Sequence, residues 1–284
     1  MKKGLILEGG AMRGLFTAGV MDVLMENGVE FDGAIGVSAG AAFGVNYKSK
    51  QIGRVLRYNT RFCRDSRYCG LRTLLKTGNI YSTEFCYEEV PLVHDLFDFD
   101  TFEKNPMEFY VVATDVETGD AVYHKYLGRD DHCFDWIRAS ASMPIVSQIV
   151  DIDGQKLLDG GISDSIPVRY FESIGYTKNV VVLTQCKGYK KKKNKALPII
   201  KSKYRKYPNL VDRLANRHIV YNDTVSYIEE QEKNGGLFVI RPEYALPVSR
   251  VEKDPEKLKA AYDIGRETAK KHLEKIKAFL NTSC

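Results

Sequence analysis

Residues 33–42 read GAIGVSAGAA, a G-x-S-x-G pattern that lies between an apolar stretch and a run of small residues. The apolar residues predict a buried strand over 31–37, and the small residues predict a helix that follows it. A serine at such a sharp strand-to-helix turn projects its hydroxyl from the sheet edge, and flanking Gly36 and Gly40 add no bulk. The helix also points its positive N-terminus at this spot. We therefore predict that Ser38 is a nucleophile, with a helix N-cap that does no chemistry as the alternative.

A similar strand and helix precede this motif. Residues 4–8 are expected to form a buried strand, and residues 15–27 have helical spacing that ends at Gly28. Two strand–helix units in succession indicate a parallel sheet with helices on both faces. Further strands are expected at 108–116, 120–126, 146–152, 155–158, 180–185 and 237–241, and further helices at 131–143, 211–233 and 255–279. We therefore predict an α/β fold with a central, mainly parallel β-sheet sandwiched by helices, and with a C-terminal helical extension.

The loop between the first strand and the first helix is rich in glycine and consists of Gly9, Gly10, Ala11, Met12, Arg13 and Gly14. A phosphate-binding P-loop would end in Gly-Lys-Ser/Thr. A dinucleotide fingerprint, G-x-G-x-x-G, would have glycine at its third position, where Ala11 stands. Because neighbouring parallel strands bring their loops to one edge, we expect this loop beside Ser38. There its N–H groups would stabilise an oxyanion. Nucleotide binding and a merely tight turn remain alternatives.

An activated serine needs a base. The five histidines, at positions 94, 124, 132, 218 and 272, lie in no recognisable motif. Asp159 is a better candidate, because it follows the strand expected at 155–158 and precedes Gly160 and Gly161. Glycines let the backbone approach closely and hold a carboxylate without bulk. An ordinary Asp-Gly turn is the alternative interpretation.

Together these segments resemble the patatin-like phospholipase family over roughly residues 4–172. The likeness depends on EGGAMRG at 8–14, GVSAG at 36–40 and DGG at 159–161, and on RASASMP at 138–144. Members of the family are serine acyl hydrolases with a Ser–Asp dyad and no catalytic histidine. The resemblance implies that Ser38 is the nucleophile and Asp159 the base, and it implies an oxyanion hole made by Gly9, Gly10 and Ala11. The residues that would support these motifs are Arg13, Gly14, Gly36, Gly40, Gly160 and Gly161.

One residue departs from the family pattern. Ala11 stands where the family has a third loop glycine, and although alanine keeps its N–H group, its side chain resists positive φ. For Arg13 we expect an ion pair with an acidic residue of the fold, with a lipid phosphate as the alternative partner.

The resemblance also implies a function. It implies hydrolysis of fatty-acyl esters of phospholipids or lysophospholipids through an acyl-enzyme, without a metal or cofactor. A small-ester or thioester hydrolase is one alternative, and a non-catalytic regulatory protein on the same fold is another, with Ala11 as its hint. The likeness further divides the chain into an acyl hydrolase core, residues 1–175, and a remainder, residues 176–284. The remainder would hold the rest of the sheet, a basic loop and the C-terminal helices.

The net charge of +5 is concentrated in one segment, because residues 187–206 hold ten basic residues, including four consecutive lysines at 190–193. The rest of the chain is net acidic, so we do not expect nucleic-acid binding. Anionic lipid attracts basic segments by about 1 kcal/mol per residue, and we expect a reversible contact of this loop with an anionic membrane. The alternative is a solvated loop. The apolar and aromatic side chains expected to enter the headgroup layer are Tyr189, Leu197, Ile199, Ile200 and Tyr204.

Length and composition are those of a globular chain. The 284 residues are 44% hydrophobic and 28% charged, enough for a sizeable core. The N-terminus lacks the roughly 7–15 apolar residues of a secretory signal, so we expect a cytoplasmic protein. The six cysteines, at 63, 69, 86, 133, 186 and 284, form no CxxC pair and are expected to be reduced thiols.

Overall fold

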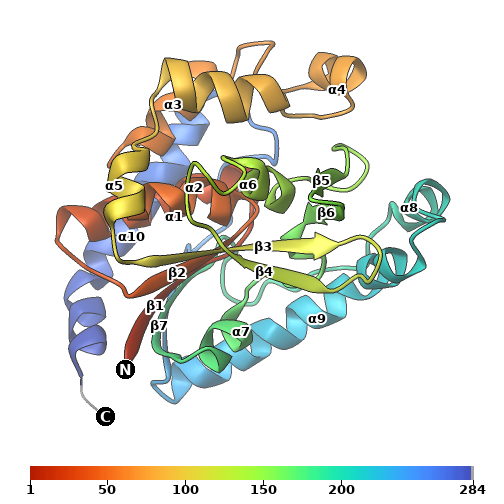
Figure 1. Cartoon of the computed structure of the whole chain (residues 1–284). Coiled ribbons are helices and arrows are strands. Elements are labelled where there is room, and N and C mark those ends of the chain that lie inside the picture. The colour runs from red at the N-terminus through yellow and green to blue at the C-terminus, as the bar shows by residue number, and fades with distance from the viewer. Residues whose placement is uncertain (283–284) are drawn as a thin grey trace.

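An eight-stranded sheet organises the computed structural model, which describes residues 1–282 (Figure 1). Across the sheet the strands run β5 (Val150–Ile152), β6 (Gln155–Asp159), β3 (Glu108–Asp115), β2 (Gly33–Val37), β1 (Lys2–Leu7), β7 (Tyr176–Val182) and β8 (Leu237–Ile240). Outside this order, β4 (Ala121–Lys125) pairs with β3. Strands β3, β2, β1, β7 and β8 are parallel neighbours, whereas β4, β5 and β6 pair antiparallel. The predicted mainly parallel sheet is therefore confirmed.

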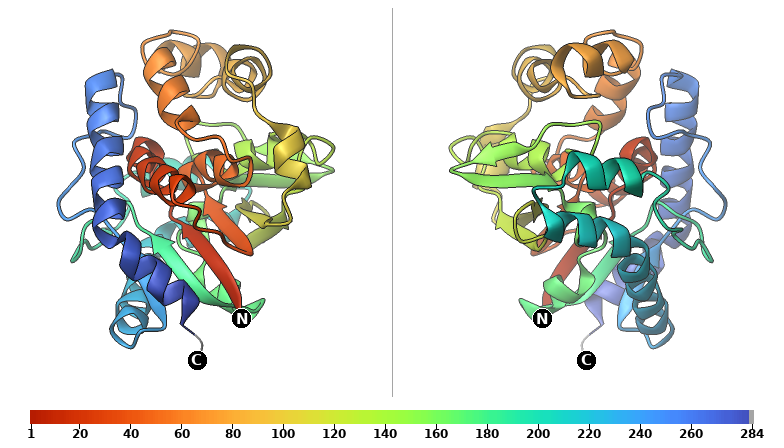
Figure 2. Two further views of the ribbon diagram at one scale, coloured as in Figure 1. Left: turned by 90° about the vertical axis from the view of Figure 1, so that its left-hand side faces the viewer. Right: turned by 90° about the vertical axis from the view of Figure 1, so that its right-hand side faces the viewer.

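Helices cover both faces of this sheet. In β1, Leu5 and Leu7 pack into one apolar cluster and Ile6 into the other, because successive strand side chains point to opposite faces. On one face lie α1 (Gly14–Glu26), α2 (Ala39–Lys48) and α10 (Pro255–Asn281), and on the other α7 (Val168–Ser173) and α9 (Pro208–Lys233) (Figure 2). The remaining helical segments are η1 (Ala11–Arg13), α3 (Arg54–Phe62), α4 (Leu71–Thr77), η2 (Phe85–His94), α5 (Phe99–Lys104), α6 (Asp135–Ser140), η3 (Gly160–Ile162) and α8 (Leu197–Lys203).

Several expected segments differ from the structure, and the strand expected at 146–152, for example, is only β5. The helix expected at 131–143 is only α6, because His132 and Cys133 have positive φ of 55° and 48°, which a helix does not permit. The strand expected at 180–185 begins earlier, since β7 pairs with β1 from Tyr176 onward. The expected basic loop contains α8, whose Ile200, 1% exposed, packs with Tyr204, 3% exposed, in a third apolar cluster.

The C-terminal helix packs directly against the first helix. A Cβ at Gly19 of α1 would lie 2.9 Å from the backbone N of Arg266, so α1 and α10 meet at backbone level. Around this contact, the Tyr262 hydroxyl donates to Asp22 at 2.7 Å, and Arg266 pairs with Glu26 at 2.8 Å. Strand β7 likewise lies inside the sheet, between β1 and β8. The division at residue 175 stays a prediction.

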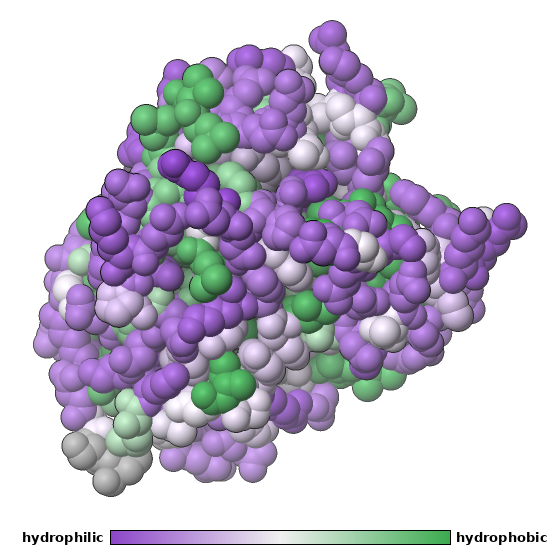
Figure 3. Space-filling view, in the orientation of Figure 1, coloured by the Kyte–Doolittle hydropathy of each residue, from purple (hydrophilic) through white to green (hydrophobic). Residues whose placement is uncertain are grey.

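The surface is largely hydrophilic on the face drawn in Figure 3, with separate apolar patches. Exposed apolar side chains include Leu71 and Leu75 of α4, at 70% and 80% exposure, and Ile199 of α8, at 61%. Within residues 1–282, no helix is long and apolar enough to cross a membrane. The cysteines at 63, 69, 86, 133 and 186 are free thiols, and Cys284 lies outside the described residues.

Candidate active site

Ser38 occupies a strained turn between β2 and α2. Its backbone has φ 55° and ψ −120°, a region that residues with a side chain rarely adopt. The Ser38 N–H donates to Oγ of Ser140 at 2.8 Å, and the Ser140 hydroxyl donates in turn to the carbonyl of Val112 in β3 at 2.5 Å. Close packing explains both flanking glycines, since a Cβ at Gly36 would overlap the backbone of Gly40. The sharp strand-to-helix turn predicted around Ser38 is therefore confirmed.

Asp159 is the last residue of β6, which pairs with β3 on the side away from β2. Its backbone N–H donates to the carbonyl of Ser142 at 2.8 Å, and its Oδ1 accepts from the N–H of Gly161 at 2.7 Å. Segment 138–144 thus holds both candidate residues, through Ser140 on one side and Ser142 on the other. A side chain at Gly160 would overlap the carbonyl of Val112, so the chain passes β3 as closely as the sequence suggested.

The Asp159 carboxyl is 5% exposed, and burial raises its pKa. The positive charge of Arg217 opposes this shift, as do the nearby hydroxyl of Ser38 and the hydrogen bond from the N–H of Gly161. Ser38 and Asp159 are therefore neighbours, although they are far apart in the sequence. A buried carboxylate with a raised pKa is a stronger base than an exposed one, and here it faces a hydroxyl.

The glycine-rich loop lies against Ser38. A Cβ at Gly9 would be 3.1 Å from the Cβ of Ser38, so only glycine lets the loop come this close. Among residues 1–282, the N–H groups of Gly9, Gly10 and Ala11 have no hydrogen-bond partner, and neither does that of Ala39 at the start of α2. Ala11 adopts the positive φ that its side chain disfavours, at 49°. These unpaired donors next to a hydroxyl can stabilise an oxyanion.

Arg13 does not form the ion pair that we expected. The nearby carboxylate of Glu8 is already bound, because it accepts from the N–H of Thr184 at 2.6 Å and from the hydroxyl of Tyr221 at 2.7 Å. The Nε of Arg13 is buried and has no partner within the described part of the chain. Burial also lowers the pKa of Arg13.

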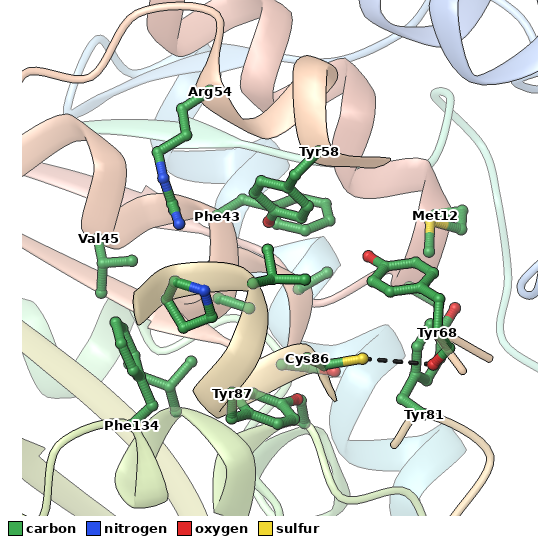
Figure 4. Close-up of a pocket in the computed structure, with 18 of the residues that line it drawn as sticks. Met12, Phe43, Val45, Arg54, Tyr58, Tyr68, Tyr81, Cys86, Tyr87 and Phe134 are labelled. Carbon is green, nitrogen blue, oxygen red and sulfur yellow. Dashed lines mark hydrogen bonds between the residues drawn. The ribbon is translucent and has the colours of Figure 1, made fainter. Parts of the chain in front are cut away.

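Two cavities meet at Ser38, and both are lined by Ala11, Ser38 and Met143. The first, which we call the tyrosine-lined cavity, has a volume of about 110 Å³ and is otherwise mainly apolar (Figure 4). Its tyrosines are Tyr58, Tyr68, Tyr81 and Tyr87. The second, which we call the cationic cavity, has a volume of about 350 Å³. Its basic residues are Arg13, Lys191, Arg217 and Arg250.

The five histidines line neither cavity. Three of them form local pairs with acidic residues, since His94 contacts Glu89, His124 contacts Asp131 and His132 contacts Asp153. The ring of His272 packs against Phe238, and His218 lies on α9. Asp159 is thus the titratable base candidate at Ser38.

Sequence reasoning missed four residues of this site. Ser140 was noted only as part of the segment RASASMP, with no role. Lys191 was assigned to a basic loop, and Arg217 and Arg250 carried no signal at all, since isolated arginines are common on helices and loops. A local pattern does not distinguish Lys191 from the lysines beside it. Lys191 is distinguished only by its position over α9. There its backbone exchanges hydrogen bonds with the side chain of Asn222, at 2.8 and 3.0 Å.

Comparison with known proteins gives matches over most of the chain. The sequence pattern described as patatin-like phospholipase matches residues 5–172, and a domain of unknown function, DUF6363, matches residues 207–281. The uncharacterised protein YjjU of Escherichia coli is 32% identical over 194 residues, which are 63% of this chain and 51% of YjjU. The lysophospholipase NTE1 of Meyerozyma guilliermondii is 24% identical over 258 residues, 84% of this chain and 17% of NTE1.

The chain therefore spans about half the length of YjjU and a smaller share of NTE1. Among solved structures, VipD from Legionella pneumophila aligns over 96% of this chain and 67% of VipD, with 12% identity and a TM-score of 0.47.

Proposed function

The chain belongs to the patatin-like phospholipase family, and from this membership we propose that it hydrolyses fatty-acyl esters of phospholipids or lysophospholipids through Ser38 and Asp159. The family and the lysophospholipase relatives support a lipid ester hydrolase in general. The observation that carries the finer proposal is that Ser38 and the buried Asp159 line the same cavity, close enough for the hydroxyl to lower the pKa of the carboxyl. Ser38 lines both cavities, and Asp159 lines the cationic one.

The reaction has two steps. In the first, Oγ of Ser38 attacks the acyl carbonyl while its proton passes to Asp159, and the N–H groups of Gly10, Ala11 and Ala39 stabilise the oxyanion. The alcohol leaves with the proton from Asp159, and an acyl-enzyme remains. In the second step Asp159 takes a proton from water as the water oxygen attacks the acyl-enzyme, and it then gives this proton to the departing Oγ of Ser38, so that the fatty acid is released and both side chains return to their starting states. The raised pKa of Asp159 suits both proton transfers.

The tyrosine-lined cavity fits the acyl chain. Ala39, Phe43 and Val90 contribute apolar surface to it, and Figure 4 shows the tyrosines and Phe134 converging on the same space. An acyl chain in this cavity can place its carbonyl at Ser38, because Ser38 lines the cavity. The presence of Ala11 was the argument for a non-catalytic protein. That argument is weakened, because Ala11 adopts a positive φ and its N–H is free among the described residues. A small-ester or thioester hydrolase on the same site remains the alternative.

We further propose a peripheral contact with anionic membrane surfaces through segment 187–206. Its Lys190, Lys192 and Lys193 are exposed, whereas Lys191 is partly buried in the cationic cavity. The burial of Ile200 and Tyr204 removes them from the residues expected to enter the headgroup layer. The exposed leucines of α4 and Ile199 of α8 are better placed for that role.

A fluorophosphonate probe tests the proposed function. We expect it to label the wild-type protein and the control Ser202→Ala, which changes an exposed serine of α8, but not Ser38→Ala. Ser38→Ala should also lose cleavage of a p-nitrophenyl ester with little change in thermal midpoint, because this hydroxyl contributes little to packing. Full cleavage by a folded Ser38→Ala protein would reject the mechanism.

A further inference from the structure

The cationic cavity has more basic than acidic residues next to the catalytic candidates. Its basic side chains are Arg13, Lys191, Arg217 and Arg250, and its acidic ones are Glu8 and Asp159. Both carboxylates already accept hydrogen bonds, Glu8 from Thr184 and Tyr221, and Asp159 from the N–H of Gly161. None of the four basic side chains forms an ion pair within residues 1–282. The cavity therefore presents four basic groups against two carboxylates, an excess of positive charge.

Hydrogen-bond donors in this cavity are also unused. The Nε atoms of Arg13 and Arg217 are buried and have no partner in the described part of the chain. A Cβ at Gly161 would lie 2.8 Å from Nη2 of Arg217 and 3.0 Å from Oδ1 of Asp159, so this guanidinium and the candidate base flank the same glycine. A buried donor without a partner is costly unless a ligand supplies the acceptor.

The fold holds Lys191 in place despite this concentration of charge. Its Nζ lies 4.1 Å from the ring centre of Tyr221, whose hydroxyl is bound to Glu8, and Asn222 fixes its backbone. Burial and the charges of Arg217, Arg13 and Arg250 together lower the pKa of Lys191 to about 7, while Glu8 opposes them. Clustered cations destabilise one another, and a bound anion relieves this repulsion.

We propose that the cationic cavity binds the phosphate of the substrate head group, and that the preferred substrate is an acyl glycerol phosphate whose head group carries no ammonium. The inference rests on the proposed function, because it assumes that the acyl ester is cleaved at Ser38. Guanidinium groups match the oxygens of a phosphate in charge and geometry. No carboxylate of the cavity is left for an ammonium group, so a choline or ethanolamine head group gains nothing there.

The two cavities account for the orientation of such a substrate. The acyl chain enters the tyrosine-lined cavity and the glycerol phosphate enters the cationic cavity, with the ester between them at Ser38. Arg217 of α9 and Arg250, which precedes α10, both belong to the region matched by the domain of unknown function. This region thereby acquires a role, since it completes the head-group side of a site whose catalytic candidates lie in residues 5–172.

The test compares three soluble substrates with the same octanoyl chain: octanoyl glycerol 3-phosphate, octanoyl glycerophosphocholine and octanoyl glycerol. We expect the wild-type kcat/KM to be highest for the phosphate monoester, by about tenfold or more over the neutral glyceride, the size of one charge-assisted hydrogen bond. Lys191→Gln and Arg250→Gln should each reduce this selectivity ratio about tenfold. The matched controls Lys193→Gln and Arg213→Gln change basic residues that do not line the cavity, and they should keep the ratio.

Two outcomes overturn the inference while the proposed function stands. One is a wild-type enzyme that cleaves the neutral glyceride as well as the phosphate ester. The other is a pair of folded cavity variants with the wild-type ratio. If the wild type cleaves none of the three substrates and is not labelled at Ser38, the proposed function itself fails.

Added anions separate a head-group subsite from a site for free phosphate. Glycerol 3-phosphate and inorganic phosphate should raise KM for octanoyl glycerol 3-phosphate and leave its kcat unchanged, because they occupy the head-group position. A change in kcat for the neutral octanoyl glycerol on adding inorganic phosphate would instead make the cavity a regulatory anion site and reject the substrate assignment.

Discussion

Ser38 and Asp159 are both held in states that cost stability. Ser38 has φ 55° and ψ −120°, and such strained backbone costs of order 1–3 kcal/mol. Asp159 keeps a carboxylate in a buried place, where its pKa is raised. Sites of this kind persist because the surrounding structure fixes them, and they are typical of catalytic groups.

Asp159→Asn should therefore separate activity from stability. The amide keeps the shape of the side chain but accepts no proton, so we expect kcat to fall by roughly 10²–10⁴-fold. The pKa of Asp159 is raised in the folded state, so its stabilising contribution is present below the unfolded pKa and is lost as pH rises through the folded pKa. At pH 7 the buried, ionised carboxylate of Asp159 therefore lowers the free energy of unfolding of the wild type, and the neutral amide of the variant does not.

We expect the thermal midpoint of Asp159→Asn to exceed that of the wild type at pH 7, with a difference that shrinks as pH falls. Calorimetry between pH 5 and 8 and ester kinetics make the two measurements. A variant with wild-type kcat would show that Asp159 is not the base.

At the scale of elements, the segment from α6 to Pro144 positions the site. Ser140 accepts from the N–H of Ser38, and the carbonyl of Ser142 accepts from the N–H of Asp159. Strands β2 and β6 are not neighbours, because β3 lies between them. One short segment that bonds to both strand ends therefore sets the distance between the proposed nucleophile and the proposed base.

Ser140→Ala tests this positioning role. It leaves the N–H of Ser38 and the carbonyl of Val112 without a partner, which should lower the free energy of unfolding by about 1–3 kcal/mol. Ser140 affects the reaction only by positioning Ser38. We therefore expect kcat to fall while KM stays near the wild-type value. Ser142→Ala is the matched control, since its hydroxyl bonds only to the carbonyl of Arg138. Equal effects of the two variants would contradict the role of Ser140.

The basic segment leads to a prediction of its own. Replacing the exposed lysines 190, 192, 193 and 195 by Gln should weaken co-sedimentation with phosphatidylglycerol vesicles, because each exposed charge contributes about 1 kcal/mol at an anionic surface. Added salt should weaken it as well, and phosphatidylcholine vesicles should bind little of either protein. Lys191 is kept, so cleavage of a soluble ester should not change. Unaltered vesicle binding by the Gln variant would show that the segment is a solvated loop without a role in membrane contact.

At the scale of the whole molecule, the C-terminal helix is joined to the active-site layer. Helix α10 packs on α1, and α1 begins at Gly14, directly after the loop that lies against Ser38. Helix α9 supplies Arg217 from the opposite face of the sheet. The site is therefore built from the whole chain and not from the family-matched part alone.

Gly265→Leu tests this connection. A Cβ at Gly265 would overlap the backbone of Phe16 in α1, so the helices must separate, and overpacking of this kind costs about 1–3 kcal/mol or more. We expect a lower thermal midpoint and a lower kcat, because α1 moves together with the loop. Ala278→Leu introduces the same side chain at an exposed position of α10 and should alter neither. An unchanged midpoint for Gly265→Leu would contradict the close helix contact.

Local patterns predicted most of the fold. Apolar runs and helical spacing located β1, α1, β2 and α2 within a few residues, because burial on one face repeats at the period of the element. The errors fell where the structure overrides the pattern. The residues before α6 have positive φ, and the expected basic loop folds into α8 because its Ile200 and Tyr204 complete an apolar cluster.

The sequence by itself determined the class of the fold, the strained serine turn and the Asp-Gly-Gly turn, since these depend on neighbours in the chain. Only the tertiary structure decided that Ser38 faces Asp159, that Ser140 holds the turn, and that basic residues converge beside them. The cationic cavity draws its side chains from the loop after β1, the segment after β7, α9 and the segment before α10. Contacts between such distant segments leave no local pattern, because the free energy of a side chain depends on what folding places around it.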